Sequence, residues 1–210
     1  MNVRRLLVDD SRSLGQIMRA RRWQRFLDTF PAIAVMSVLD LGGTVEFWMR
    51  SPVRPAQLTL VNLTDETTDA DWIDSKTHDA CSYQPDRNYD LVVSNSLIEH
   101  VGGYRSRRDL ATVIRSAAPR YWVQTPYRYF PVEPHWLFPG MQFLPAPARA
   151  VVAHKWPLAH TRASGYQEAL ESALWTELVG KAEFSTLFPD SKILFERVAG
   201  IPKSLIAIRP

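Results

Sequence analysis

Two histidines and one glutamate are the residues of this sequence best suited to proton transfer. Glu133 and His135 stand close together in a proline-rich segment, and His100 lies earlier in the chain. An imidazole titrates near neutral pH, and a neighbouring carboxylate can orient the ring or stabilise its protonated form. We predict that His135 acts as a general base oriented by Glu133, with His100 as the rival base. A hydrogen-bonded structural role for His135, packed under Trp136, is the alternative.

The same proline-rich segment carries a group of aromatic side chains, which are Tyr127, Tyr129, Phe130, Trp136 and Phe138. Aromatic planes interleaved with polar groups suit a sugar, because its ring has apolar C–H faces and a polar hydroxyl rim. Arg128 adds a guanidinium that can bond hydroxyls or a carboxylate. We therefore expect Tyr127, Arg128, Tyr129 and Trp136 to contact a substrate. At least two of the aromatic side chains of this segment should face the cleft that holds it. Packing within the loop is the alternative for each of them.

A pair of glycines marks a third segment with chemical meaning, Asp40-Leu41-Gly42-Gly43-Thr44. Glycines let a ligand approach the backbone, and they permit φ values that other residues resist. The pattern lacks both GxGxxG and GxxxxGK[ST], so neither a dinucleotide nor a nucleoside triphosphate is favoured. An adenosine ligand without phosphates fits better, and a plain strand-to-helix turn is the alternative.

Hydrophobic periodicity predicts the elements that must position these residues. Strands are expected at residues 37–41, 58–63, 90–95, 120–125, 191–197 and 204–208. Helices are expected from a cap at Ser13 to about Phe30, and at residues 106–118, 167–179 and 176–188. Strands that alternate with helices predict an α/β fold with a mostly parallel sheet, covered by helices on both faces. Prolines between residues 126 and 147 exclude a continuous helix or central strand there and predict a structured loop or lid.

Polar and small residues follow the expected strands at the edge where ligands of such sheets collect. Asn62 ends the second strand, about twenty residues after the glycine pair, where a polar side chain can bond ribose hydroxyls. Ala80 and Cys81 precede the third strand, and Asn95 ends it. The order of these residues favours a single ligand-binding edge.

This ordered set resembles the class I S-adenosylmethionine-dependent methyltransferases, above all those in which a strand of the type DLVVSN runs into an Ile-Glu-His-Val turn. The resemblance covers most of the chain. It implies a Rossmann-like fold with a mostly parallel, seven-stranded sheet. It also implies S-adenosyl-L-methionine as the cofactor and S-adenosylhomocysteine as the product.

Carried over by position, the resemblance assigns the cofactor to residues at the ends of the expected strands. It implies that the methionine moiety lies beside Gly42, Gly43 and Thr44, the ribose beside Asn62, the adenine edge beside Ala80, and the sulfonium above Asn95. Asp40, Leu63 and Cys81 complete the expected cofactor-binding set.

Two features depart from the family pattern. The usual E/DxGxGxG motif is shortened to residues 40–44, and Asn62 stands where the family usually has an acidic ribose ligand. An amide loses the charged hydrogen bond to the ribose, so Asp65 competes with Asn62 for that role.

The acceptor segment is similar to that of small actinobacterial methyltransferases, and more narrowly to the sugar 1-O-methyltransferases of mycobacterial 3-O-methylmannose polysaccharide synthesis. This likeness implies a small carbohydrate acceptor, the 1-OH of a short methylated mannoside, with His135 taking the hydroxyl proton. One alternative is methylation of another small natural product or a lipid. A second is a non-catalytic, cofactor-binding subunit of a partner enzyme.

Composition bounds the domain organisation, the partners and the location. The 210 residues predict one domain, with an N-terminal helical segment (about 1–30) and a proline-rich acceptor loop (about 126–147). The formal charge of +3 comes largely from arginines near the N-terminus without a recognition motif, so nucleic acid is not an expected partner. No apolar stretch reaches the ~20 residues of a membrane helix, and the single Cys81 fits a reducing cytoplasm.

Sequence spacing gives no cluster of His, Cys, Asp and Glu that is typical of a metal site. A divalent-metal requirement therefore stays open at this level. Whether the chain forms a homo-oligomer stays open as well.

Overall fold

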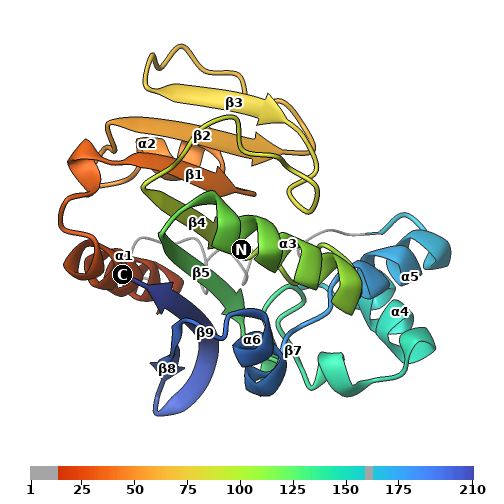
Figure 1. The fold of residues 1–210 in the computed structure, drawn as a ribbon. Coiled ribbons are helices and arrows are strands. Elements are labelled where there is room, and N and C mark those ends of the chain that lie inside the picture. The colour runs from red at the N-terminus through yellow and green to blue at the C-terminus, as the bar shows by residue number, and fades with distance from the viewer. Residues whose placement is uncertain (1–13, 159–162) are drawn as a thin grey trace.

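A seven-stranded sheet forms the centre of the computed structural model, which describes residues 14–158 and 163–210 (Figure 1). The strands are β1 (Ser37–Leu41), β2 (Gln57–Asn62), β3 (Ile73–Thr77), β4 (Leu91–Asn95), β5 (Arg120–Pro126), β8 (Lys192–Val198) and β9 (Ile201–Arg209). Their order in the sheet is β3-β2-β1-β4-β5-β9-β8. Strands β1 to β5 are parallel, whereas β9 runs antiparallel between β5 and β8. The predicted mostly parallel, seven-stranded sheet is confirmed.

Helices cover both faces of this sheet. They are α1 (Leu14–Thr29), α2 (Val45–Met49), α3 (Tyr104–Ala117), α4 (Ala146–Lys155), α5 (Tyr166–Trp175) and α6 (Lys181–Leu187). Alternate strand residues point to opposite faces. Leu39 and Val92 are buried in one core cluster with residues of α3 and α6, and Val38 and Val93 are buried in another with residues of α1 and α2. The prediction of helices on both faces is therefore confirmed.

The sequence pattern misses β3, α2 and α4, and its predicted helices at residues 167–179 and 176–188 overlap. Strand β3 lies at the sheet edge with only Ile73 buried, so it lacks the apolar run of the central strands. Helix α2 has five residues, too few for a periodic pattern. Helix α4 begins inside the proline-rich segment, because Pro147 stands in its first turn, where a missing N–H breaks no intrahelical bond. The helix predicted through residues 176–180 is wrong, since Val179 there forms a parallel bridge with Tyr127.

The proline-rich acceptor loop (residues 126–147) forms a compact unit of its own. It contains the two-residue strands β6 (Val132–Glu133) and β7 (Phe138–Pro139) and the 3-10 helix η3 (Met141–Phe143). Trp136 and Met141 are buried in a small core with alanines of α4 and α5. The loop is thereby held beyond the end of β5 by packing as well as by its prolines.

Helix α1 is the described part of the predicted N-terminal helical segment, and residues 1–13, with the expected cap Ser13, lie outside the described residues. Arg22 of α1 donates to both carboxylate oxygens of Glu196 on β8, at 2.9 and 2.7 Å. This ion pair ties the helix to the far edge of the sheet. Across residues 14–158 and 163–210, no helix is both long enough and apolar enough to cross a membrane.

Candidate active site

A cleft of about 930 Å³, including space open to solvent, lies at the edge where the parallel strands end. The residues that line it come from the glycine loop, from the segments after β2 and before β4, from the turn after β4, and from α3 and α5. They are Gly42, Val61, Asn62, Leu63, Thr64, His78, Asp79, Ala80, Cys81, Leu97, His100, Val101, Ser106 and Trp175. Most predicted cofactor residues therefore meet in one cleft of a size that suits a small molecule.

Both glycines of the loop are required by its shape. Gly42 has φ +80°, a conformation that disfavours side chains, and its N–H donates to the carbonyl of Val61 at 2.9 Å. A Cβ on Gly42 would lie 2.9 Å from Leu97, and a Cβ on Gly43 would lie 1.9 Å from the carboxylate of Asp40. The backbone at Gly42 consequently forms a cleft wall that no other residue could form without movement.

Asp40 and Thr44, both predicted to bind the cofactor, hold this loop from beneath. Asp40 is buried, its Oδ2 accepts from Trp48 Nε1 at 2.7 Å, and burial raises its pKa to about 7. Its Oδ1 has no hydrogen-bond partner among the described residues. The Thr44 hydroxyl accepts from the backbone N–H of Phe47 at 3.2 Å and so caps α2. Neither side chain belongs to the described lining of the cleft, so each supports the loop's shape.

Asn62 joins the glycine loop to the end of β2. Its Nδ2 donates to the carbonyl of Gly43 in a short hydrogen bond, which leaves Oδ1 as the acceptor that the side chain can offer a ligand. Leu63 beside it is exposed, and Ala80 and Cys81 line the same cleft. This arrangement is compatible with the predicted ribose and adenine contacts.

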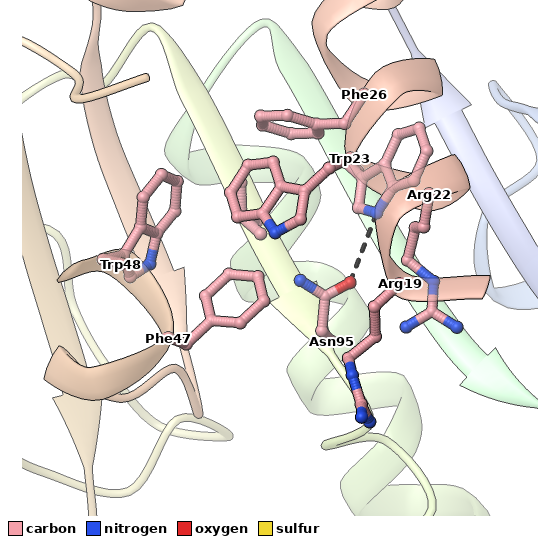
Figure 2. Close-up of a pocket in the computed structure, with 9 residues that line it drawn as sticks. Arg19, Arg22, Trp23, Phe26, Phe47, Trp48 and Asn95 are labelled. Carbon is pink, nitrogen blue, oxygen red and sulfur yellow. Dashed lines mark hydrogen bonds between the residues drawn. The ribbon is translucent and has the colours of Figure 1, made fainter. Parts of the chain in front are cut away.

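Asn95 lies elsewhere, in a second pocket on the α1 and α2 side of the sheet (Figure 2). Its Oδ1 accepts from Trp122 Nε1 at 3.3 Å, as the dashed line in Figure 2 shows. The pocket is mainly aromatic, with Trp23 stacked on Phe47 at 5.0 Å between ring centroids. The described lining of the first cleft therefore does not include Asn95, the residue expected near the sulfonium.

Glu133 holds His135 in a fixed orientation. The Glu133 carboxylate is buried and accepts from the backbone N–H groups of His135 and Trp136 at 2.7 and 3.0 Å. Its other oxygen lies 2.6 Å from Nδ1 of the His135 ring. This contact directs the second ring nitrogen, Nε2, away from Glu133. The structure thus brings together the glutamate and histidine that the sequence pairs.

His100 and Glu99 complete a cluster with His135. The two imidazoles meet edge to face at 4.9 Å between ring centroids. Burial, together with the charge of His135, lowers the pKa of His100 to about 4, so His100 is neutral at pH 7. Glu99 is buried, its Oε2 accepts from the Thr125 hydroxyl at 3.0 Å, and burial raises its pKa to about 7. His100 also lines the cleft, so the cluster joins the cleft to the acceptor loop, to which His135 belongs.

The residues predicted to bind an acceptor are spread around this cluster. Tyr127 and Tyr129 contact each other with ring centroids 5.5 Å apart, and Tyr129 is 59% exposed. Arg128 lines a separate polar pocket with Arg149, and Trp136 is buried in the small core of the acceptor loop. The described lining of the cleft contains none of these four residues.

Sequence reasoning missed several residues of the cleft, among them Trp175 and Ser106, which come from helices. Trp175 ends α5 and is 61% exposed, although large aromatic side chains are usually buried. No local pattern predicts this position. The fold brings Trp175, at the end of α5, to the same cleft as the residues that follow β4.

No protein-family model matches the sequence, and no curated protein sequence matches it. Several solved structures, in contrast, are similar to this chain in fold. The N-methyltransferase NodS from Bradyrhizobium japonicum WM9 has a TM-score of 0.53 and 11% identity, covering 92% of this chain and 97% of NodS. The magnesium protoporphyrin IX methyltransferase ChlM from Synechocystis PCC 6803, solved with bound SAM, has a TM-score of 0.51 and 10% identity, covering 100% of this chain and 90% of ChlM. The chain therefore has the Rossmann-like fold of the class I methyltransferases.

Proposed function

We propose that the protein is an S-adenosylmethionine-dependent O-methyltransferase that acts on a sugar hydroxyl. One observation carries the proposal: His135, oriented by Glu133, packs against His100, which lines the cleft beside the glycine loop. A proton acceptor next to a small-molecule cleft is what methylation of a hydroxyl requires.

The cleft supports S-adenosyl-L-methionine as the donor. NodS and ChlM share this fold, and each has been solved with the cofactor or its product S-adenosylhomocysteine. In this chain the backbone at Gly42 would lie beside the methionine moiety, Asn62 would bond the ribose, and Ala80 and Cys81 would contact the adenine. None of these contacts needs a phosphate-binding group, in agreement with the missing phosphate motifs.

The acceptor cluster supports a hydroxyl substrate. His135 would take the hydroxyl proton as the methyl group moves from sulfur to oxygen, and Glu133 would stabilise the resulting imidazolium. We favour His135 over His100 because Glu133 fixes its ring. The 1-OH of a short methylated mannoside suits this chemistry, since a hemiacetal hydroxyl is more acidic than an ordinary alcohol.

Purified protein, labelled cofactor and methylmannosides test this proposal. We expect a methylated sugar identified by product mass spectrometry, and a turnover roughly 10²- to 10⁴-fold lower for His135→Ala with cofactor affinity unchanged. The exposed His154→Ala on α4 is the matched control. Label found only in RNA or protein would exclude the sugar, and a loss confined to His100→Ala would make His100 the base.

A further inference from the structure

Glu99, His100 and His135 form a group whose ligand atoms converge. Each residue offers one nitrogen or oxygen, and the three atoms lie within 4.8 Å of one another. Tetrahedral ligands about 2.1 Å from a zinc ion are roughly 3.4 Å apart. Side-chain movements of about an ångström would therefore bring all three atoms to one ion.

Two atoms of this group are buried without a hydrogen bond. Glu99 Oε1 and His100 Nδ1 have no partner among the described residues, although the Glu99 side chain is fully buried. Buried polar atoms in folded proteins nearly always have a partner, and a bound ion is one recognised reason for an exception. Both atoms belong to residues of the converging group, so one cation bound through them would satisfy both.

Glu133 supplies the support that a metal-binding histidine usually has. A histidine that binds a metal through one nitrogen commonly donates the other N–H to a carboxylate, which fixes the ring and makes it a better ligand. His135 Nδ1 lies 2.6 Å from Glu133 Oε1, so Nε2 would be the nitrogen that meets the ion. The buried Glu133 is itself held by the backbone N–H groups of His135 and Trp136.

We propose that Glu99, His100 and His135 bind a divalent transition-metal ion of the zinc type. Two imidazoles and one carboxylate suit zinc, cobalt or iron, whereas magnesium and calcium prefer oxygen ligands alone. Three protein ligands also leave a coordination position for a substrate oxygen.

The catalytic meaning of this site rests on the proposed function, whereas ion binding does not. A hydroxyl bound to such an ion loses its proton more easily, because the positive charge stabilises the alkoxide. In the loaded protein, His135 would act on the acceptor through the ion, and the hydroxyl proton would pass to solvent water as the methyl group moves from sulfur to oxygen. The site joins His100, which lines the cleft, to His135, which belongs to the acceptor loop.

Cobalt titration of the chelator-treated, full-length protein tests the site directly. We expect one equivalent of Co²⁺ per chain with visible absorption typical of four- or five-coordinate cobalt, and competition by Zn²⁺. Glu99→Gln and His100→Ala should each weaken binding about 100-fold or more, and Glu133→Gln about 10- to 100-fold. His154→Ala should bind as the wild type does.

The outcomes separate this inference from the proposed function. Circular dichroism would first show that Glu99→Gln is folded. A Zn²⁺-induced rise in Tm that occurs in the wild type and not in Glu99→Gln would then support the site. Equal Co²⁺ affinity in wild type, Glu99→Gln and His100→Ala would overturn it, as would a chelator-treated wild-type protein that takes up no Co²⁺. Tight cobalt binding without methyl transfer to any acceptor would leave the site standing and refute the proposed function.

Discussion

The two loops at the ligand-binding edge each cover a buried carboxylate, and the two carboxylates are bonded very differently. Asp40, under the glycine loop, accepts one hydrogen bond, from Trp48, and its Oδ1 has no partner among the described residues. Glu133, in the acceptor loop, accepts from the backbone of His135 and Trp136 and contacts the His135 ring. The glycine loop thus covers a carboxylate with a single hydrogen bond, whereas the acceptor loop folds around a carboxylate that accepts several.

The two loops therefore take their shapes from different physical causes. The glycine loop depends on the absence of a side chain, because a Cβ on Gly43 would overlap the Asp40 carboxylate. The acceptor loop depends on charge-assisted hydrogen bonds, because several N–H groups converge on Glu133. The first loop should reject added atoms and accept the loss of a charge. The second should do the reverse.

Gly43→Ala should have the largest effect, lowering the free energy of unfolding by about 3 kcal/mol. The reason is steric, since the new Cβ would lie 1.9 Å from Asp40 Oδ2. Urea denaturation measures the loss. Gly103→Ala is the matched control, because a Cβ there meets no atom within 4 Å, and it should lose less than about 1 kcal/mol.

Asp40→Ala provides a sharper test of the same contact. It removes the carboxylate that the methyl group added by Gly43→Ala would meet, so the double variant should lose less than the sum of the two single variants. A coupling of about 1 kcal/mol or more is expected for groups in such direct contact. Strictly additive losses would contradict the close packing of this loop.

Glu133→Gln should come next, lowering the free energy of unfolding by about 2 kcal/mol. A neutral amide cannot accept all the donors that face the carboxylate, and its own N–H₂ would meet one of them. Thermal unfolding checks this, with Glu171→Gln at an exposed position of α5 as the control. Wild-type stability in Glu133→Gln would mean that hydrogen bonds to Glu133 do not hold the acceptor loop.

Asp40→Asn should have the smallest effect and the opposite sign. Burial raises the pKa of Asp40 from 3.8 to about 7, so between these values the folded protein holds a proton that the unfolded chain has lost. Wild-type stability contributed by this group is therefore lost as pH rises from 4 to 7. The neutral amide avoids that loss, and its advantage over wild type should grow by roughly 1–2 kcal/mol between pH 5 and pH 6. An advantage that shrinks over this range in urea denaturation would contradict the raised pKa.

Much of the fold could be predicted because the central strands are buried on both faces and read as continuous apolar runs. Strand β1 was predicted with its observed bounds, Ser37–Leu41. Strand β3 could not be, because one side of an edge strand has no neighbour and its sequence, IDSKT, stays polar. The start of α4 was hidden by Pro145 and Pro147, which suit a helix N-terminus as well as a loop.

The site was predictable only where its residues are close in sequence. Glu133 and His135 are two positions apart, so their contact could be expected. Glu99 and His100 meet His135 because β4 and β5 are neighbours in the sheet, a pairing that no local spacing reveals. The position of Asn95 depends on which side of β4 it faces, and its bond to Trp122 settles that question.

Cys81 gives the cleft a chemical handle, because it is the only cysteine in the 210-residue chain and it lines the cleft wall. Burial, with a smaller contribution from the charge of Asp79, raises the pKa of its thiol to about 12. The thiol is therefore protonated at neutral pH and reacts slowly with alkylating reagents. Labelling under forcing conditions would attach a single fluorophore per molecule at the cleft wall, where a ligand that enters the cleft would change its emission.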